Sequence, residues 1–120
     1  MEWEEVQELI RTTLIVGFHL SETRIIKEIP PYQCNRYQYN DTGYSVQIGD
    51  NDSLDIPWSM LKTVFNDSII QPGRIYNNGV FIIHYAHQAK VKGCHIHVIG
   101  EMFELSGVAE ARGYRNYVIL

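Results

Sequence analysis

Apolar residues at the start of the chain recur at every third or fourth position, the spacing of one side of an α-helix. They are Trp3, Val6, Leu9, Ile10 and Leu14. Four glutamates between positions 2 and 8 fall in the first turns, where the helix dipole favours negative charge. The pattern predicts an amphipathic helix that ends near Gly17.

The apolar residues that follow predict a second, shorter helix. Ser21 is a suitable N-cap for it, and the prolines at positions 30 and 31 cannot continue it. Its apolar side chains are Ile25, Ile26 and Ile29. The chain is therefore expected to begin with two helices.

From position 36 the helical spacing gives way to alternation, in which every second residue is apolar or aromatic. Residues 41–43 and 49–53 are rich in turn formers and separate three such runs. The runs are Tyr37/Tyr39, Tyr44/Val46/Ile48 and Leu54/Ile56. They predict a three-stranded antiparallel meander.

Helical spacing returns after the meander. Pro57 suits the first position of a third helix, and residues 71–73 close it. Its apolar stripe consists of Trp58, Leu61, Val64 and Phe65. Residues 74–76 predict a brief strand and residues 77–79 a turn or an N-cap.

Residues 80–85 are compatible with a buried strand or a helix, because most of them are β-branched or aromatic. Their polar continuation and Gly93 favour a helix. Ile96, Ile99 and Phe103 predict a further helix through Leu105, with Gly107 near its end. A terminal strand at 114–120 follows a turn at 112–113.

These elements predict an α+β fold in a single domain that covers residues 1–120. It consists of N-terminal helices, a three-stranded antiparallel meander and a C-terminal helix–helix–strand unit. A chain of 120 residues is long enough to bury one hydrophobic core.

Charge is distributed unevenly along the chain. Residues 1–69 carry five Lys/Arg and eleven Asp/Glu, whereas residues 70–120 carry five and three, which gives the stated net charge of −4. A net-acidic chain is a poor general binder of polyanions, because that affinity comes from neutralising phosphates. Contacts with phosphate are therefore expected only from the C-terminal half.

Two absences bear on the compartment. No apolar run approaches the roughly 20 residues that cross a bilayer, and the acidic start is unlike a signal peptide. Cys34 and Cys94 are too few for a disulfide framework and are expected to be reduced. We therefore expect a cytoplasmic protein that does not enter the membrane.

The segment GCHIHVIGE, residues 93–101, is the strongest candidate for metal chemistry. On a strand His95 and His97 would share one face, with Glu101 near it, and this spacing resembles the first motif of the cupins, H-x-H-x3-E. A cupin also needs a later histidine, and none follows His97. On a helix the two imidazoles would point apart.

A mixed metal site, with zinc as the cofactor it would hold, is the alternative that this segment leaves open. Its candidate ligands are His84, His87, Cys94, His95, His97 and Glu101. Such a site would imply a metal-dependent hydrolase or oxygenase. Otherwise no cofactor is expected.

An enzyme is the less expected class. The serines lack a glycine elbow, and no phosphate-binding loop is present. The sequence therefore offers no catalytic residue.

Aromatic residues suggest surfaces that could bind a partner. Tyr32, Tyr37, Tyr39 and Tyr44 could stack a base or a partner's side chain, or could simply pack over the first helix. Trp3, Trp58 and the terminal Tyr-Val-Ile-Leu could form a homodimer surface. A protein-interaction or inhibitor module acting through the acidic N-terminal half and these tyrosines is thus an alternative function.

The C-terminal segment suggests a different partner. A helix from His95, the segment RGYRNY at 112–117 and a final strand resemble the recognition helix and wing of a winged-helix domain, counting from Asn77. The resemblance implies phosphate contacts from the basic residues around them. Glu101 and Glu104 depart from a typical recognition helix, because they would repel a duplex.

These observations predict a small, non-enzymatic recognition module that binds a nucleic acid or a nucleotide-like anion. Arginine and lysine would pair with phosphate oxygens and the tyrosine would stack. The predicted ligand-binding residues are Arg74, Lys90, Lys92, Arg112, Tyr114 and Arg115.

Overall fold

A computed structural model describes residues 1–28, 32–34 and 40–120. The first half contains α1 (Trp3–Thr13), β1 (Arg24–Glu28), β2 (Gln33–Cys34), β3 (Asp41–Ile48) and β4 (Asp52–Pro57). The second half contains α2 (Trp58–Ile69), the 3-10 turn η2 (Pro72–Arg74), β5 (Ile75–Tyr76), α3 (Asn78–Val91), α4 (Cys94–Leu105), β6 (Ala109–Ala111) and β7 (Tyr117–Ile119).

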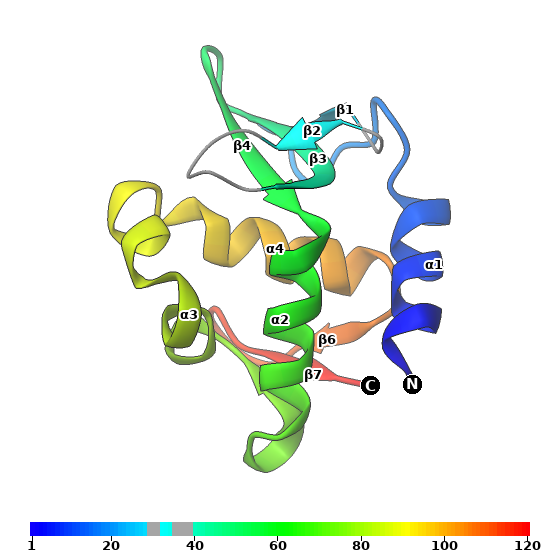
Figure 1. Cartoon of the computed structure of the whole chain (residues 1–120), viewed down its shortest axis with the longest axis vertical. Helices are drawn as coiled ribbons and strands as arrows, with labels where there is room; N and C mark the ends of the chain where they lie inside the picture. The colour runs from blue at the N-terminus through cyan, green and yellow to red at the C-terminus, as the bar shows by residue number, and fades with distance from the viewer. Residues whose placement is uncertain (29–31, 35–39) are drawn as a thin grey trace.

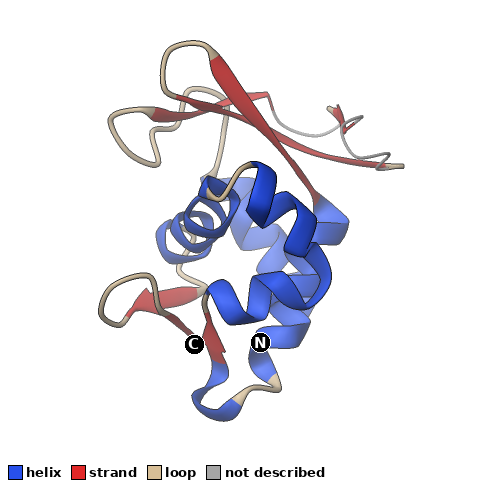
Figure 2. Cartoon of the chain, turned by 90° about the vertical axis from the view of Figure 1, so that its left-hand side faces the viewer, coloured by secondary structure: helices blue, strands red, loops and turns tan. Residues whose placement is uncertain are grey.

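The fold is α+β, with two separate antiparallel sheets. In the first sheet β3 pairs with β1, β2 and β4, and in the second the strand order is β5-β7-β6. Figures 1 and 2 show the helices lying between the two sheets, with α1 on one flank of the molecule and α3 on the other. Helix α4 contacts α1, α3, β4 and β6, so it occupies the centre.

The predicted second helix is wrong, because its residues form β1. The amide of Ile26 donates to the carbonyl of Phe18, and Gly17 donates back to the carbonyl of Ile26. On its other side β1 pairs with β3 from Arg24 opposite Ile48. Adjacent β-branched isoleucines fit such a ladder better than a helix. Ile29 and the two prolines, expected in the same helix and at its end, lie outside the described residues.

The predicted turn at 41–43 is also wrong, because β3 runs straight through it. A Cβ on Gly43 would overlap the carbonyl oxygen of Ile56, so this glycine permits a close approach of β4 rather than a turn. Asp41 accepts a hydrogen bond from the Ser59 amide at 2.6 Å and so caps α2 from a distant part of the chain. Of the three runs expected in the meander, Tyr37/Tyr39 lies outside the described residues and the other two are β3 and β4.

Helices α1, α2 and α4 form where the apolar spacing predicts them, and the ambiguous segment 80–85 lies in a helix, α3, as its polar continuation indicates. Helix α1 ends at Thr13 rather than near Gly17. Helix α4 ends at Leu105, as the apolar spacing predicts. Gly107, at φ 77°, takes the left-handed conformation that stops the helix. The residues that follow form β6, a strand that the helical spacing concealed, so the C-terminal unit has two paired strands after its helices.

The hydrophobic core joins residues of both halves in one cluster. Trp3 packs against Trp58 with ring centroids 6.2 Å apart, and Tyr44 packs against Trp58 at 5.4 Å. Trp58 is buried, so the predicted homodimer surface of the two tryptophans is not displayed. None of the helices in residues 1–28, 32–34 and 40–120 is long and apolar enough to cross a lipid bilayer.

The close approach at Gly43 can be tested by two matched substitutions. Gly43→Ala should reduce the free energy of unfolding by about 3 kcal/mol, because the new methyl group overlaps backbone that cannot move alone. Gly49→Ala should cost only about 1 kcal/mol, because Gly49 has open space around it and only its φ of 69° is unfavourable. Urea denaturation measures both, and equal losses would contradict this account of Gly43.

Candidate functional site

The turn between β6 and β7 presents the most prominent basic and aromatic groups of the C-terminal half. The amide of Arg112 donates to the carbonyl of Asn116 at 2.8 Å and closes the turn, and Gly113 has φ 76°. Tyr114 at its tip is 79% exposed, and the guanidinium of Arg115 lies 4.6 Å from the centre of the Tyr114 ring. The turn thus holds an arginine and an exposed aromatic ring next to each other.

Arg115 also lines a pocket of about 430 Å³ at the start of two helices. The other lining residues are Asn78 in the first turn of α3 and Gly93, Cys94, Ile96 and His97 around the first turn of α4. We call this the Arg115 pocket. Backbone N–H groups concentrate at the start of a helix and favour anions there, so the pocket combines helix dipoles with a cationic side chain.

The register of the second sheet brings the walls of this pocket together. Tyr76 lies opposite Tyr117, which places Asn77 beside Asn116 at the end of the ladder. The two asparagine side chains hydrogen-bond at 3.1 Å. Asn77 also caps α3, because its side chain accepts from the amide of Val80. One short ladder therefore fixes the start of α3 against the turn that carries Arg115.

His97 contributes a polar group that is neutral at pH 7. Burial lowers the pKa of His97, and the positive charges of Arg115 and Arg24 lower it further. An anion bound beside the imidazole would favour its protonated form. The pocket can therefore gain a second positive charge when it holds an anion.

The structure places the other predicted ligand-binding residues differently. Arg112 pairs with Glu110 at 2.8 Å, on the solvent side of the turn. Lys92 precedes the pocket residue Gly93, but its amino group is 2.6 Å from Asp52 and 2.9 Å from the carbonyl of Ser53. Lys90 is exposed near the end of α3.

Arg74 lies apart from all of these groups. Its guanidinium donates to the carbonyl oxygens of Ile119 and Leu120. Those residues are at the far end of β7 from Arg115, a separation of about 15 Å along a strand of this length. Of the predicted residues, the structure brings together Arg115, Tyr114 and Arg112, places Lys92 nearby, and separates Arg74.

The candidate metal ligands are spread over several environments. Helix α4 places His95 and His97 on different sides, as the helical alternative requires, so the cupin-like spacing has no strand to carry it. His84 pairs with Asp67 at 2.8 Å, and Glu101 pairs with Arg24 of β1. In the part of the chain that the structure describes, no group of three or more His, Cys, Asp or Glu could hold a metal ion.

The tyrosines of the first sheet are less available than the alternation suggests. Tyr44 is fully buried and its hydroxyl faces the carbonyl of Ile10 at 3.4 Å. The hydroxyl of Tyr32 donates to Asp55 at 3.2 Å. Tyr37 and Tyr39 lie outside the described residues.

Sequence patterns missed Asn78 and Ile96 as pocket residues, and offered Cys94 and His97 only as metal ligands. The turn at 112–117 and the N-cap at 77 are both readable in the sequence. The turn and the N-cap face each other because β5 pairs with β7, and a strand of only two residues cannot be recognised in the sequence.

Comparison with known proteins does not identify the chain. No protein family, curated protein or solved structure matches this chain.

The buried histidine of α4 makes stability depend on pH. His95 is 1% exposed, stacks on Phe81, and its Nδ1 lies 2.9 Å from the carbonyl of Lys92. Burial lowers the pKa of His95, although the carbonyls of Lys92 and Asp55 oppose this. The unfolded chain therefore binds the proton more readily, and the free energy of unfolding should fall as pH decreases below about 6.5.

Replacing His95 by Asn, which keeps a donor for the Lys92 carbonyl, should reduce this loss between pH 7.5 and pH 5. A residual slope from His97 should remain, because burial lowers its pKa too. The exposed His19 offers the control substitution His19→Asn, against which the slope of the His95 variant is compared. Urea titrations across the pH range measure the slope, and an unaltered slope in the His95 variant would show that His95 does not cause it.

Proposed function

We propose that the chain binds a nucleotide or a single-stranded nucleic acid, with a phosphate group in the Arg115 pocket and a base stacked on Tyr114. The observation that carries the proposal is the conformation of Arg115. Its φ of 63° is left-handed, a region that costs a residue with a side chain about 1 kcal/mol or more. Such strain suggests a functional role at a residue whose guanidinium makes no hydrogen bond or ion pair with the other described residues.

Arg74 provides the comparison within the same chain. It too has a left-handed φ, of 54°, but its guanidinium makes two hydrogen bonds to the end of β7. Among the described residues Arg115 pairs with no carboxylate, and its guanidinium lies 4.6 Å from the centre of the Tyr114 ring. The charged end of Arg115 is therefore available to a ligand, and the first turns of α3 and α4 are arranged around the same pocket.

The shape of the site favours an unpaired base over a duplex. Arg115 occupies one side of the Tyr114 ring, and the high exposure of this ring leaves the other side open for stacking. Helix α4 is largely buried, and its outward side carries the exposed Glu104. A helix in this position would repel the backbone of a duplex rather than enter its groove.

The order of elements is consistent with the winged-helix resemblance. From α2 onward the chain runs helix, strand, helix, helix, strand, turn and strand, with β7 between β5 and β6. In this resemblance the 112–116 turn would correspond to the wing, and α4 to the recognition helix. In the proposed function the wing and the first turn of α4 bind phosphate, and the buried remainder of α4 supports them.

Substituting Arg115 should separate binding from stability. Arg115→Gly removes the guanidinium and also relieves the left-handed strain. We expect affinity for a fluorescently labelled dT oligonucleotide to fall about 10-fold or more, as the loss of a hydrogen bond to a charged group implies. The free energy of unfolding should stay equal or increase. Fluorescence anisotropy and urea denaturation provide the two measurements.

Two further variants sharpen the test. Arg11→Ala removes the same charge from the exposed Arg11–Glu8 pair on α1 and should leave affinity almost unchanged. Tyr114→Ala should weaken binding of the oligonucleotide but not of inorganic phosphate, because only the base stacks. The proposal fails if the wild-type chain binds neither oligonucleotide nor nucleotide at low salt, or if Arg115→Gly binds as well as Arg11→Ala does.

A further inference from the structure

The outward face of α3 exposes three large apolar side chains beside polar ones. Ile82 and Ile83 are 42% and 54% exposed in the part of α3 that precedes a kink at Tyr85, where Val80 and Phe81 are buried. Val91, in the part after the kink, is 51% exposed. A helix that is apolar on both sides is normally covered on both sides. The exposed side of α3 is therefore a candidate contact surface.

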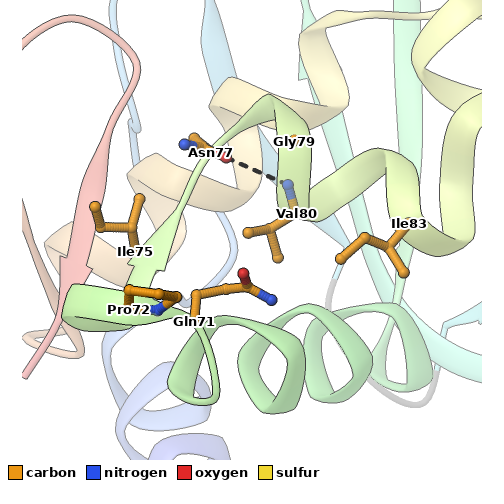
Figure 3. Close-up of a pocket in the computed structure, with 7 residues that line it drawn as sticks. All are labelled: Gln71, Pro72, Ile75, Asn77, Gly79, Val80 and Ile83. Carbon is orange, nitrogen blue, oxygen red and sulfur yellow. Dashed lines mark hydrogen bonds between the residues drawn. The ribbon is translucent and has the colours of Figure 1, made fainter.

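A cleft of about 360 Å³ adjoins this face. Figure 3 shows Val80 and Ile83 of α3 on one side of it and Gln71, Pro72 and Ile75 on the other. The hydrogen bond between Asn77 and Val80 fixes the start of α3 at its rim. The cleft can accept an apolar side chain that projects from a docked helix.

The charges around α3 restrict what can dock. No Asp or Glu occurs between Ser68 and Gly100, so α3 itself carries no carboxylate, and Lys90 is exposed on it. Asp67 of α2, which lies beside α3, is paired with His84. The surface therefore favours an occupant that is apolar and acidic.

The outward face of α1 has this chemistry. A shallow hollow on it is lined by Glu4, Glu5, Glu8, Leu9 and Thr12, and Ile15 and Val16 just beyond α1 are also exposed. Figure 1 shows α1 and α3 on opposite flanks of the molecule, so the two faces cannot meet within one chain. Each chain thus carries two apolar faces on opposite flanks, one on α3 with an exposed lysine and no carboxylate of its own, and one on α1 with several glutamates.

We propose that the chain associates with itself head to tail, the outward face of α1 in one copy docking on the outward face of α3 and the adjoining cleft in the next. Such a contact is heterologous, so it can continue from copy to copy. Its size is limited by α1, which is about 16 Å long, and by α3, which is broken into two shorter pieces at Tyr85. An interface of this size belongs to the small, transient class, so association should be weak and should weaken further with salt.

Sedimentation analysis of three protein samples tests the proposal. Between about 10 μM and about 1 mM the wild-type chain should exceed the mass of a dimer of 13.9 kDa subunits, because each added copy leaves a free face. One variant, Ile83→Glu, places a charge on the α3 face only, and it should remain monomeric. A second variant, Glu4→Lys with Glu8→Lys, reverses the charge of the α1 face only, and it should also remain monomeric. Mixed in equal amounts, they should form a heterodimer and nothing larger, because one intact face of each kind remains.

Other outcomes overturn the proposal. A wild-type chain that stays monomeric, or a mixture that stays monomeric while the wild type associates, excludes this pairing of faces. Self-association of the α1 variant alone indicates a symmetric contact through α3 instead. Glu22→Lys with Glu110→Lys makes the same change in charge at other exposed positions and should associate like the wild type. Thermal unfolding confirms that each variant is folded.

Discussion

The rest of the structure depends on the burial of α4 between the two sheets. On the side of the second sheet, Gly100 lets the ring of Tyr117 approach the helix so closely that a Cβ would overlap it. On the side of the first sheet, Glu101 pairs with Arg24 of β1. Burial raises the pKa of the Glu101 carboxylate, and the positive charge of Arg24 opposes this effect. Removing either contact would leave an unfilled space or an unpaired charge next to the core.

The central position of α4 also determines where chemistry can take place. The side chains of most of its residues are buried, so only its first turn and the edge that carries His97 are available to a ligand. The pairing of β5 with β7 then brings the turn with Tyr114 and Arg115 to this end of the helix. The proposed site is thus a consequence of how the sheet and the helix are packed. Among the residues that line the pocket, Arg115 is the one with a strained backbone, and it is also the residue that we expect to contact phosphate.

The sequence predicts those parts of the fold that depend on local periodicity. Helices α1, α2 and α4 follow from apolar spacing, and the β3–β4 hairpin from alternation around turn residues. Helix α3 follows from the polar residues and the glycine after an apolar run that is compatible with a strand or a helix. The prediction fails where long-range contacts decide the outcome: Ile25 and Ile26 form a strand because β3 offers a ladder, and Gly43 marks a close contact with β4 rather than a turn. Local patterns carry no information on such distant neighbours.

In the candidate site, too, the sequence predicts the local features and misses those that depend on distant contacts. The basic and aromatic turn is visible as RGYRNY, and Arg115 and Tyr114 are found in that way. Lys92 and Arg74 have the right charge but are bound to Asp52 and to the end of β7, which no sequence pattern signals. Asn78 enters the pocket through the sheet register alone, so it could not be selected in advance.

The proposed phosphate site can be mapped directly by following backbone amide signals in a two-dimensional 15N–1H NMR titration with a short dT oligonucleotide at low salt. The account predicts that the largest shifts belong to residues 78, 93–97 and 114–116, and that they move together along one binding curve. Shifts of that size on the outward faces of α1 or α3 instead, or no shifts at millimolar oligonucleotide, would contradict it.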